Sequence, residues 1–429
     1  MSRTTRTGLQ RWPLTLVPAI LLCASALGCS PRAYPVKVGI LHSLTGTMAI
    51  SETSLRDAAQ MAIEEINAAG GVLGRSLEPV IADGGSNWDL FEERARELLT
   101  EHRVAVVFGC WTSISRKAVL PVFESLHGLL FYPVQYEGEE MSPNIFYLGA
   151  APNQQLIPGA DFMMRPEGGT KRKFYLLGTD YVFPRTANKI LKAYLLSVGV
   201  PEKDIVEEYT PFGHADYQTI VGKIKEFGKA GDAAVLSTIN GDSNVPFYKE
   251  FANQGLTADK IPIMAFSVAE DELRSMETEH LVGHLAAWNY YQSIDTPENK
   301  AFVEAFKKYA VAKGLPGGTN RVTDDPIEAA YFGVYVWKAA VEKANSFDVD
   351  KVVPSVLGLE FDAPGGKKKM HPENHHTFKP VYIGKIRADG QFDVISKSAG
   401  LVEPEAFSHY LKGEKKEEPK VTEKKEEKK

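Results

Sequence analysis

Short apolar runs alternate with amphipathic segments along almost the whole chain. Residues 36–41 form an apolar run of strand length, and apolar residues then recur at three- and four-residue spacing from Leu55 to Ile66, which predicts a helix. An apolar run at 104–109 and a helix that begins near Ser113 continue the alternation. Strands that alternate with helices through short loops form parallel sheets covered on both faces, so this half of the chain predicts an α/β lobe.

The same pattern begins again near residue 150. Strand-length apolar runs stand at 173–179, 205–211, 233–239 and 261–266, with helical periodicity between them. Further helices are expected at about 298–313 and 326–344. Residues 380–396 predict a hairpin with Asp389-Gly390 as its tight turn. The sequence therefore predicts a second, similar lobe, each lobe being a doubly wound parallel sheet.

The N-terminus has the order of a secretory signal. Three arginines (Arg3, Arg6 and Arg11) precede an apolar run at 14–22, and small residues follow. Residues 24–26 offer an A-x-A cleavage site, whereas ALGC at 26–29 resembles a bacterial lipobox that departs from the usual pattern by beginning with alanine. We expect residues 1–29 to be a lipoprotein-type signal and Cys29 to carry the lipid anchor, with A-x-A cleavage as the alternative.

Composition narrows the class of protein. The chain has 429 residues, 44% of them hydrophobic and 24% charged, and a formal net charge of −6. It therefore lacks the basic footprint of a nucleic-acid-binding protein. After the signal, Cys110 is the only cysteine, so no internal disulfide can form and we expect a buried, inert thiol. Residues 412–429 consist mostly of Lys, Glu and Pro, which predicts a disordered tail.

Several segments resemble a known family. They are GILHSLTG at 39–46, INAAGGVLGR at 66–75 and DYQTIV at 216–221. Together they make the chain from residue 36 to about 402 similar to the type I periplasmic binding proteins that take branched-chain amino acids and amides. Four others narrow the likeness to the urea-binding component of urea ABC transporters: FGCWTSISRKAV at 108–119, YPVQYEG at 132–138, APNQQ at 151–155 and GTDYVFPR at 178–185.

The resemblance implies the architecture and the activity. It implies two lobes joined by a multi-strand hinge, the N-terminal lobe being 35–150 plus about 284–345 and the C-terminal lobe 151–283 plus about 346–403. It also implies an extracytoplasmic or periplasmic protein, monomeric or homodimeric, without a cofactor. Such a protein captures urea between its lobes and delivers it to a membrane-embedded ABC permease.

The chemistry of urea indicates which residue types bind it. Urea is flat and neutral, with one carbonyl acceptor and two NH2 groups, so its site needs donors, acceptors and flat walls. Trp111, Thr112 and Ser113 follow the strand at 104–109 at a helix start, where free N–H groups suit a carbonyl oxygen. Tyr132 and Gln135 follow the next strand. We expect Trp111 and Tyr132 to form walls and the amide oxygen of Gln135 to accept from an NH2 group.

The second lobe supplies three further candidates. Tyr181 and Asn240 follow the strands at 173–179 and 233–239, and ligands in open α/β sheets bind beyond such strand ends. Glu270 follows the strand at 261–266, roughly where the resembled family keeps an acidic residue. A carboxylate accepts two parallel N–H bonds, one from each urea nitrogen. The neighbouring Asp271 is the alternative acceptor.

Other functions are less well supported by the residues. His371, Glu373, His375 and His376 lack the helical spacing of a zinc site and predict a polar loop beside Pro372. No P-loop, G-x-G-x-x-G or G-x-S-x-G motif occurs, and no nucleophile–base pair is evident for a urea or amide hydrolase. Binding of short amides or branched-chain amino acids remains the alternative to urea.

Overall fold

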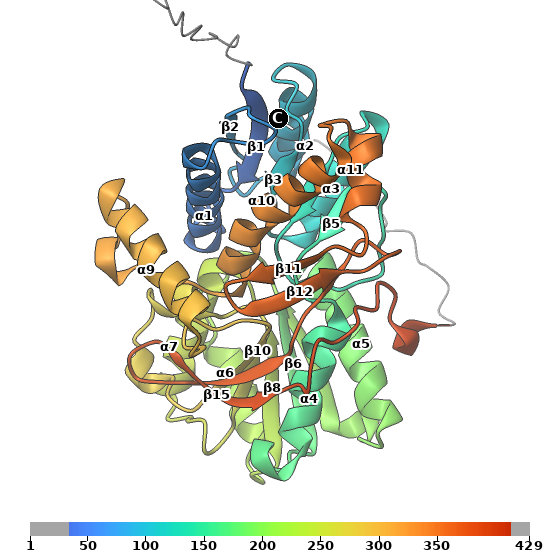
Figure 1. Cartoon of the computed structure of the whole chain (residues 1–429). Helices are drawn as coiled ribbons and strands as arrows, with labels where there is room; N and C mark the ends of the chain where they lie inside the picture. Colours follow the sequence, from blue (N-terminus) through green and yellow to red (C-terminus); the bar gives the residue numbers. More distant parts are fainter. Residues whose placement is uncertain (1–33, 413–429) are drawn as a thin grey trace, which may run out of the picture. The chain divides into compact units, whose positions relative to one another are not determined.

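The first part of the chain forms a five-stranded parallel sheet in the computed structural model, which describes residues 34–412 (Figure 1). Its strands are β1 (Val36–His42), β2 (Leu77–Asp83), β3 (Val107–Gly109), β4 (Leu130–Tyr132) and β5 (Ile145–Tyr147). They lie in the order β2-β1-β3-β4-β5. The predicted signal segment with Cys29 and the predicted tail from residue 413 fall outside the described residues.

Alternation along the strands explains why helices cover both faces of this sheet. Leu41, Val107 and Leu130 join an apolar cluster that includes residues of helices α2 and α3, whereas the adjacent Ile40 and Phe108 join the cluster of helices α10 and α11. Successive strand residues point to opposite faces, and each fully buried side chain of this size contributes roughly 1.5–3 kcal/mol. The helices are α1 (Ala49–Ala68), α2 (Trp88–Thr100), α3 (Ser113–Ser125), α10 (Asp325–Ala344) and α11 (Val349–Val356).

The second sheet repeats the strand order of the first. Its parallel strands are β6 (Lys173–Thr179), β7 (Ile205–Thr210), β8 (Ala233–Thr238), β9 (Ile263–Ala265) and β10 (Leu285–Trp288). They run β7-β6-β8-β9-β10, and the antiparallel hairpin β14 (Tyr382–Ile386) and β15 (Phe392–Lys397) extends the sheet beyond β10. Gly390 has a φ of +74° in the hairpin turn, a conformation that glycine adopts without strain.

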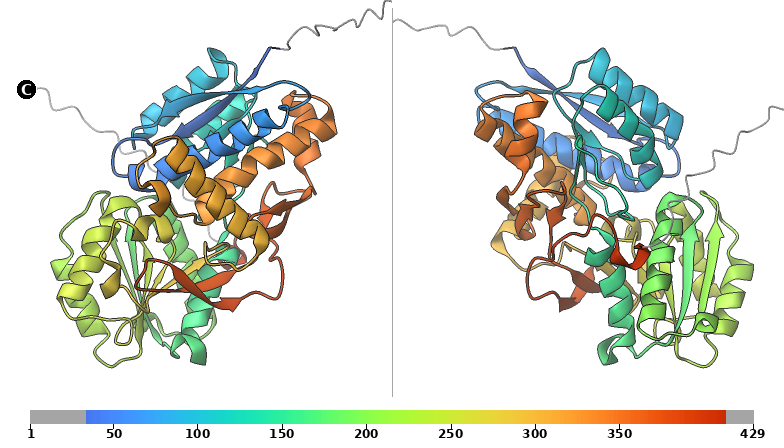
Figure 2. Two further views of the ribbon diagram at one scale, coloured as in Figure 1. Left: turned by 60° about the vertical axis from the view of Figure 1, so that its left-hand side comes forward. Right: turned by 90° about the vertical axis from the view of Figure 1, so that its right-hand side faces the viewer.

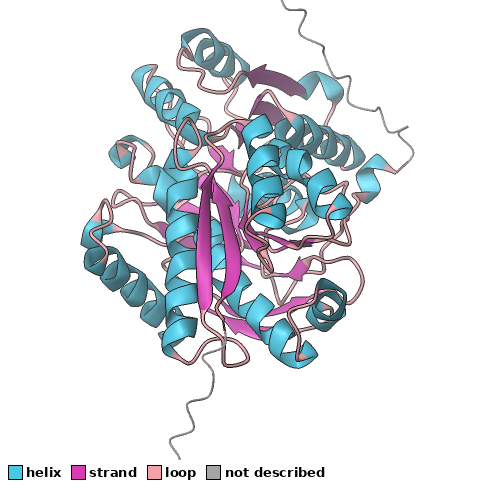
Figure 3. Cartoon of the chain, turned by 90° about the horizontal axis from the view of Figure 1, so that it is seen from above, coloured by secondary structure: helices cyan, strands magenta, loops and turns pink. Residues whose placement is uncertain are grey.

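Four helices enclose the second sheet. Helices α4 (Leu156–Met164) and α5 (Val182–Ser197) share an apolar cluster with one set of strand residues, and α6 (Gln218–Phe227) and α7 (Asn244–Asn253) share the other. Figure 3 shows the strands of both lobes between helices. The predicted type I periplasmic binding protein fold, with two doubly wound parallel-sheet lobes, is therefore confirmed.

Three chain segments cross between the lobes, at residues 148–155, 289–296 and 379–381 (Figure 2). The buried side chain of Asn289 ties them together. Its amide nitrogen donates to the main-chain oxygen of Gln154 at 3.0 Å and to that of Pro380 at 2.7 Å. One residue of the second crossover thus bonds to both of the others, which fixes where the lobes join.

The lobe limits differ in two places from those expected from the sequence. Strand β10 pairs with β9 and β14, so the return to the first lobe begins after Trp288 and not near 284. Helix α11 packs on the first lobe, because Val352 and Val356 complete the apolar cluster around Trp337. A small sheet of β11 (Glu360–Ala363), β12 (Gly366–Met370) and β13 (Thr377–Phe378) follows it.

Within residues 34–412, no helix combines the length and the apolarity needed to cross a bilayer.

Candidate ligand-binding site between the lobes

Both sheets have a topological switch point, where the strand order reverses beside the first strand of the lobe. In the first lobe this point lies between β1 and β3, and in the second between β6 and β8. The carboxyl ends of these strands lead into His42, Trp111, Tyr181 and Asn240. Ligands of open α/β sheets bind at such points, so these four residues lie where the fold predicts a binding site.

Trp111 lies where the two lobes meet. Its side chain is buried, and the indole N–H donates to Oδ1 of Asn240 in the second lobe at 3.4 Å. The Tyr132 hydroxyl donates to the main-chain oxygen of Trp111 at 2.5 Å, which ties the end of β4 to the loop after β3. The two aromatic residues predicted as walls are therefore neighbours in the first lobe.

Thr112 and Ser113 have different roles at the start of α3. Thr112 is the N-cap, and its hydroxyl accepts from the N–H of Ser115 at 3.1 Å. The hydroxyl of Ser113 is held by the carboxylate of Glu137 and by the guanidinium of Arg116. Both hydroxyls are thus engaged within the protein. The first N–H groups of a helix have no intrahelical partner, and among the described residues those of Ser113 and Ile114 have no protein acceptor.

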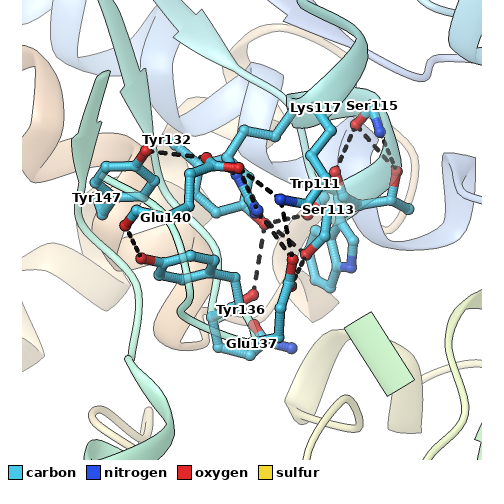
Figure 4. A network of polar contacts seen from close by, with 12 residues as sticks. Trp111, Ser113, Ser115, Lys117, Tyr132, Tyr136, Glu137, Glu140 and Tyr147 are labelled. Atoms are coloured by element: carbon cyan, nitrogen blue, oxygen red, sulfur yellow. Dashed lines mark hydrogen bonds and ion pairs between the residues drawn. The ribbon is translucent and has the colours of Figure 1, made fainter. Parts of the chain in front are cut away.

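A buried ionic network connects the start of α3 with Tyr132 and the loop that follows β4 (Figure 4). Arg116 is fully buried, and its guanidinium pairs with Glu140 at 2.7 Å and with Glu137 at 3.2 Å while lying 4.9 Å from the ring centre of Tyr132. Burial opposes ionisation of Glu140, but the charges of Arg116 and Lys117 outweigh it and lower its pKa to about 2. The network keeps α3 and Tyr132 in a fixed relation.

Gln135 joins the two lobes directly. Its amide nitrogen donates to the main-chain oxygen of Phe266 at 2.9 Å and to the hydroxyl of Ser267 at 3.2 Å, both just after β9. Because a carbonyl oxygen can only accept, these contacts fix which end of the amide is nitrogen. The other end, Oε1, is buried without a hydrogen-bond partner in the described part of the chain. An acceptor is therefore presented where the sequence predicts one.

The second-lobe candidates Tyr181 and Asn240 stand at neighbouring strand ends. The Tyr181 ring packs on Phe212 at 4.8 Å between centres, and its hydroxyl has no hydrogen bond to another described residue. Burial raises the pKa of this hydroxyl, so it stays protonated as a potential donor. Asn240 receives the Trp111 indole N–H and donates to the main-chain oxygen of Thr238 at 3.1 Å.

Glu270 and Asp271 lie in the short helix α8 (Glu270–Leu273), and their contacts lead elsewhere. One oxygen of Glu270 accepts from the N–H of Gln292 in the second crossover at 2.7 Å, and the other is buried and unpaired. Asp271 accepts from Ser54 of α1 at 2.5 Å. Within residues 34–412, neither carboxylate bonds to Trp111 or to another predicted site residue.

The contact between α8 and α1 closes the lobes against each other. Ser51 donates to Glu272 at 2.6 Å, beside the bond from Ser54 to Asp271. The loop after β8 also touches the first lobe, where the N–H of Asp242 donates to the oxygen of Thr47 at 3.4 Å. The structure therefore has the lobes in a closed arrangement.

Two polar residues that the sequence reasoning did not single out lie beside the predicted site. His42 ends β1, and Glu52 lies in the first turn of α1; both are almost completely buried. The only signal for His42 in the sequence is the GILHSLTG segment, which carried the family resemblance but no role for this residue.

The histidines near residue 375 are integrated into the first lobe. His376 stacks on Tyr147 with 4.4 Å between ring centres and bonds to the Tyr136 hydroxyl, and burial lowers its pKa to about 3. His375 stacks on Phe146 at 4.5 Å. The expected polar loop is therefore exposed at Pro372 and Glu373, while His375 and His376 are buried because their imidazole rings stack on aromatic rings of β5. Cys110 is buried and free, as predicted, and burial raises the pKa of its thiol.

The fold and the residues between the lobes define a solute-binding protein with two α/β lobes. The chain belongs to the periplasmic binding protein family, whose domain model matches residues 36–413. Leu/Ile/Val-binding protein homolog 6 of Brucella melitensis is 24% identical over 381 residues, which cover 87% of this chain and 92% of that protein.

Solved structures share the fold. A solute-binding protein of an ABC transporter from Rhodopseudomonas palustris HaA2, in complex with p-hydroxybenzoic acid, superimposes with a TM-score of 0.74 at 22% identity, over 86% of this chain and 98% of that one. The branched-chain amino acid transporter protein LivJ from Streptococcus pneumoniae, in complex with isoleucine, gives 0.71 at 19% identity, over 86% and 100%.

Proposed function

We propose that this chain captures urea between its two lobes outside the cytoplasm and delivers it to the permease of an ABC transporter. The observation that carries the proposal is the buried, unpaired amide oxygen of Gln135, a residue whose main-chain oxygen shares the Tyr132 hydroxyl with that of Trp111. A buried acceptor without a partner costs about 1–3 kcal/mol, and a ligand N–H group removes that cost. The site therefore favours a small ligand with N–H donors.

The remaining predicted residues complement the rest of the urea molecule. The unpaired N–H groups of Ser113 and Ile114 at the start of α3 suit its carbonyl oxygen, and the positive end of the helix reinforces them. Trp111 and Tyr132 supply flat surfaces, and the Tyr181 hydroxyl is a free donor or acceptor from the second lobe. Glu270 stays in the proposed set only as a prediction, because its contacts lie along the second crossover.

Branched-chain amino acids are the second candidate ligand, because two of the relatives named above are a Leu/Ile/Val-binding protein homolog and a branched-chain amino acid transporter protein. An amino acid needs a partner for its α-carboxylate. The buried guanidinium of Arg116, which stacks on Tyr132, is already paired with Glu137 and Glu140 and so is not available to a ligand. The carboxylate would have to take the unpaired N–H groups at the start of α3 in place of the urea oxygen. Short amides also offer an NH2 group to the Gln135 oxygen, but they have only one such group where urea has two.

A hydrolase acting on urea or amides would need an activated nucleophile. Cys110 is the thiol nearest to the predicted site in sequence, but burial raises its pKa, which keeps it in the unreactive protonated form. The relatives and solved neighbours named above are binding proteins. We therefore propose a carrier function without catalysis.

Calorimetry on residues 30–429, without the predicted signal and lipid-bearing cysteine, tests the proposal. Urea, acetamide and leucine are titrated in turn into this protein. We expect saturable one-to-one binding of urea, weaker binding of acetamide and none of leucine. Tight leucine binding without urea binding would replace urea by an amino acid as the ligand.

A further inference from the structure

We propose that His42 and Glu52 are two further ligand-binding residues of the first lobe, and that they make the site selective for ligands with several N–H donors. The inference rests on the proposed function, because it adds contacts to the same site. It assigns the carboxylate that accepts from the ligand to Glu52 in the first lobe, whereas the sequence predicted Glu270 in the second.

The two side chains form a buried pair with two free ends. Nδ1 of His42 lies 3.1 Å from Oε2 of Glu52, and the N–H of Ser43 donates to the same oxygen at 2.8 Å. The second oxygen, Oε1, and the second ring nitrogen, Nε2, are both buried and have no partner among the described residues. Both side chains are at most 1% exposed. Buried polar atoms normally find a partner, so two unpaired atoms on one pair require an explanation.

Topology places the pair at the predicted site. Leu41 of β1 pairs in register with Gly109 of β3, and the N–H of Cys110 donates to the oxygen of Leu41 at 2.8 Å. His42 is therefore the last residue of β1, and Trp111 lies two residues after the end of β3, at the switch point of the first sheet. Ser51, the neighbour of Glu52 on α1, donates to Glu272 of the second lobe at 2.6 Å. The pair thus lies at the end of the first lobe that meets the second.

The hydrogen bonds determine what the free ends offer. A carboxylate oxygen only accepts, so Nδ1 of His42 carries a proton. We propose that the ring binds the ligand as the Nδ1–H tautomer, in which Nε2 has the lone pair. The ligand then meets three buried acceptors: Nε2 of His42, Oε1 of Glu52 and Oε1 of Gln135. Urea has four N–H bonds with which to pair them. A ligand carboxylate would face the charge of Glu52 and would pair none of them.

Two variants on helix α1 test the contribution of Glu52. Glu52→Gln keeps the size of the side chain but replaces an acceptor by an NH2 group. We expect it to weaken urea binding at least tenfold in calorimetry. Glu65→Gln is the matched control, because Glu65 lies on the same helix and accepts from the hydroxyls of Tyr331 and Tyr335 at 2.6 and 2.7 Å, with no contact to the predicted site. It should bind urea like the wild type.

A second measurement on the wild-type protein does not depend on the folding of a variant. With ¹⁵N-labelled histidine, the Nε2 resonance of His42, assigned by comparison with His42→Gln, should shift on addition of urea along the calorimetric binding curve. A merely structural pair would leave that resonance unmoved. Tetramethylurea, which has no N–H bond, should neither bind nor shift it, whereas guanidinium, with six N–H bonds, should do both.

The outcomes separate the two proposals. If urea binds, but Glu52→Gln binds it normally and the Nε2 resonance stays fixed, the inference is wrong and the proposed function stands. If urea does not bind but guanidinium or acetamide binds and shifts Nε2, the proposed function is wrong and the inference stands. A wild-type protein that binds none of these N–H-bearing probes overturns both.

Discussion

The amide nitrogen of Gln135 in the first lobe donates a 2.9 Å hydrogen bond to the main-chain oxygen of Phe266 in the second. One side chain therefore performs two tasks, since its nitrogen joins the lobes and its oxygen stays unpaired for a ligand. The two tasks are separable by mutation because they use different atoms.

Gln135→Glu keeps an acceptor oxygen but removes the donor to Phe266. The second carboxylate oxygen then opposes a carbonyl oxygen in the closed arrangement, so closure should become less favourable. We expect urea affinity to fall about tenfold or more, which corresponds to about 1.4 kcal/mol or more at 25 °C. Gln254→Glu is the control, since Gln254 donates to a main-chain oxygen within the second lobe only. Equal affinities of the two variants in calorimetry would contradict a bridging role for Gln135.

Trp111 is predicted to be a flat wall whose indole N–H also reaches Asn240. Trp111→Ala should weaken urea binding by more than about tenfold, while Trp111→Phe keeps a flat ring and should retain most of the affinity. If urea changes the intrinsic fluorescence of the wild type through this indole, the change should be absent in Trp111→Phe even though calorimetry still detects binding. A fluorescence response that persists in this variant would assign the signal to another tryptophan.

The hydroxyl of Ser54 on α1 donates to Asp271 of the second lobe at 2.5 Å, a bond that separation of the lobes would break. Ser54→Ala should therefore lower urea affinity roughly threefold to tenfold, since one hydrogen bond contributes about 0.5–1.5 kcal/mol. Small-angle scattering should show a smaller radius of gyration with saturating urea in the wild type, and Ser54→Ala should need more urea for the same change. Thr53→Ala is the control, because Thr53 bonds only to Ala49 of its own helix. Binding of urea without any change in radius would rule out closure on the ligand.

Glu270 predicts a dependence of folding stability on pH. Burial raises its pKa to about 8 against the opposing hydrogen bond from Gln292, whereas an unfolded glutamate titrates near 4.3. Between these values the folded protein holds a proton that the unfolded chain releases, so stability falls as pH rises from about 5 through 8. Glu272, with a pKa raised to about 7, acts in the same direction.

Glu270→Gln imitates the protonated form and should flatten the decrease in melting temperature between pH 5 and 8. The same variant decides the role predicted from the sequence. A ligand acceptor at Glu270 requires that Glu270→Gln lose urea binding while Asp271→Asn keeps it, whereas a role confined to the contact with Gln292 requires near-normal binding in Glu270→Gln.

Cys29 lies outside the described residues, so its role stays a prediction from the ALGC segment at the end of the signal. Cys29→Ser should move the protein from the membrane fraction to the soluble extract when cells are fractionated. Continued membrane association of the variant would indicate another anchor, and a wild-type protein already in the soluble extract would indicate cleavage at the A-x-A site.

Local patterns predicted the fold well because strands and helices are encoded by the spacing of apolar residues. The hairpin around Asp389-Gly390 was predictable from its turn residues alone. The placement of α11 was not, because Val352 and Val356 could complete either core and only the position of Trp337 in space decides.

Candidate residues could be chosen from the sequence where they lie at or just after the end of a strand, as for Trp111, Tyr132 and Asn240. Glu52 was not predicted, because an acidic residue in the first turn of a helix is ordinarily explained by its favourable interaction with the helix dipole. Its relation to His42 depends on how α1 returns over the end of β1. For Glu270, the sequence indicated a strand end but not which way the side chain points.

The hydroxyls of Ser51 and Ser54 hold α8 through bonds in which no ligand atom takes part. If a bound molecule leaves only after these bonds break, its dissociation rate depends in part on contacts that are the same for every ligand. Substitutions of Ser51 or Ser54 should then change the dissociation rate of every ligand by the same factor and leave the ranking of ligands unchanged. Substitutions on α1 and α8 can therefore change how long a ligand stays bound, while the residues at the strand ends continue to determine which ligand binds.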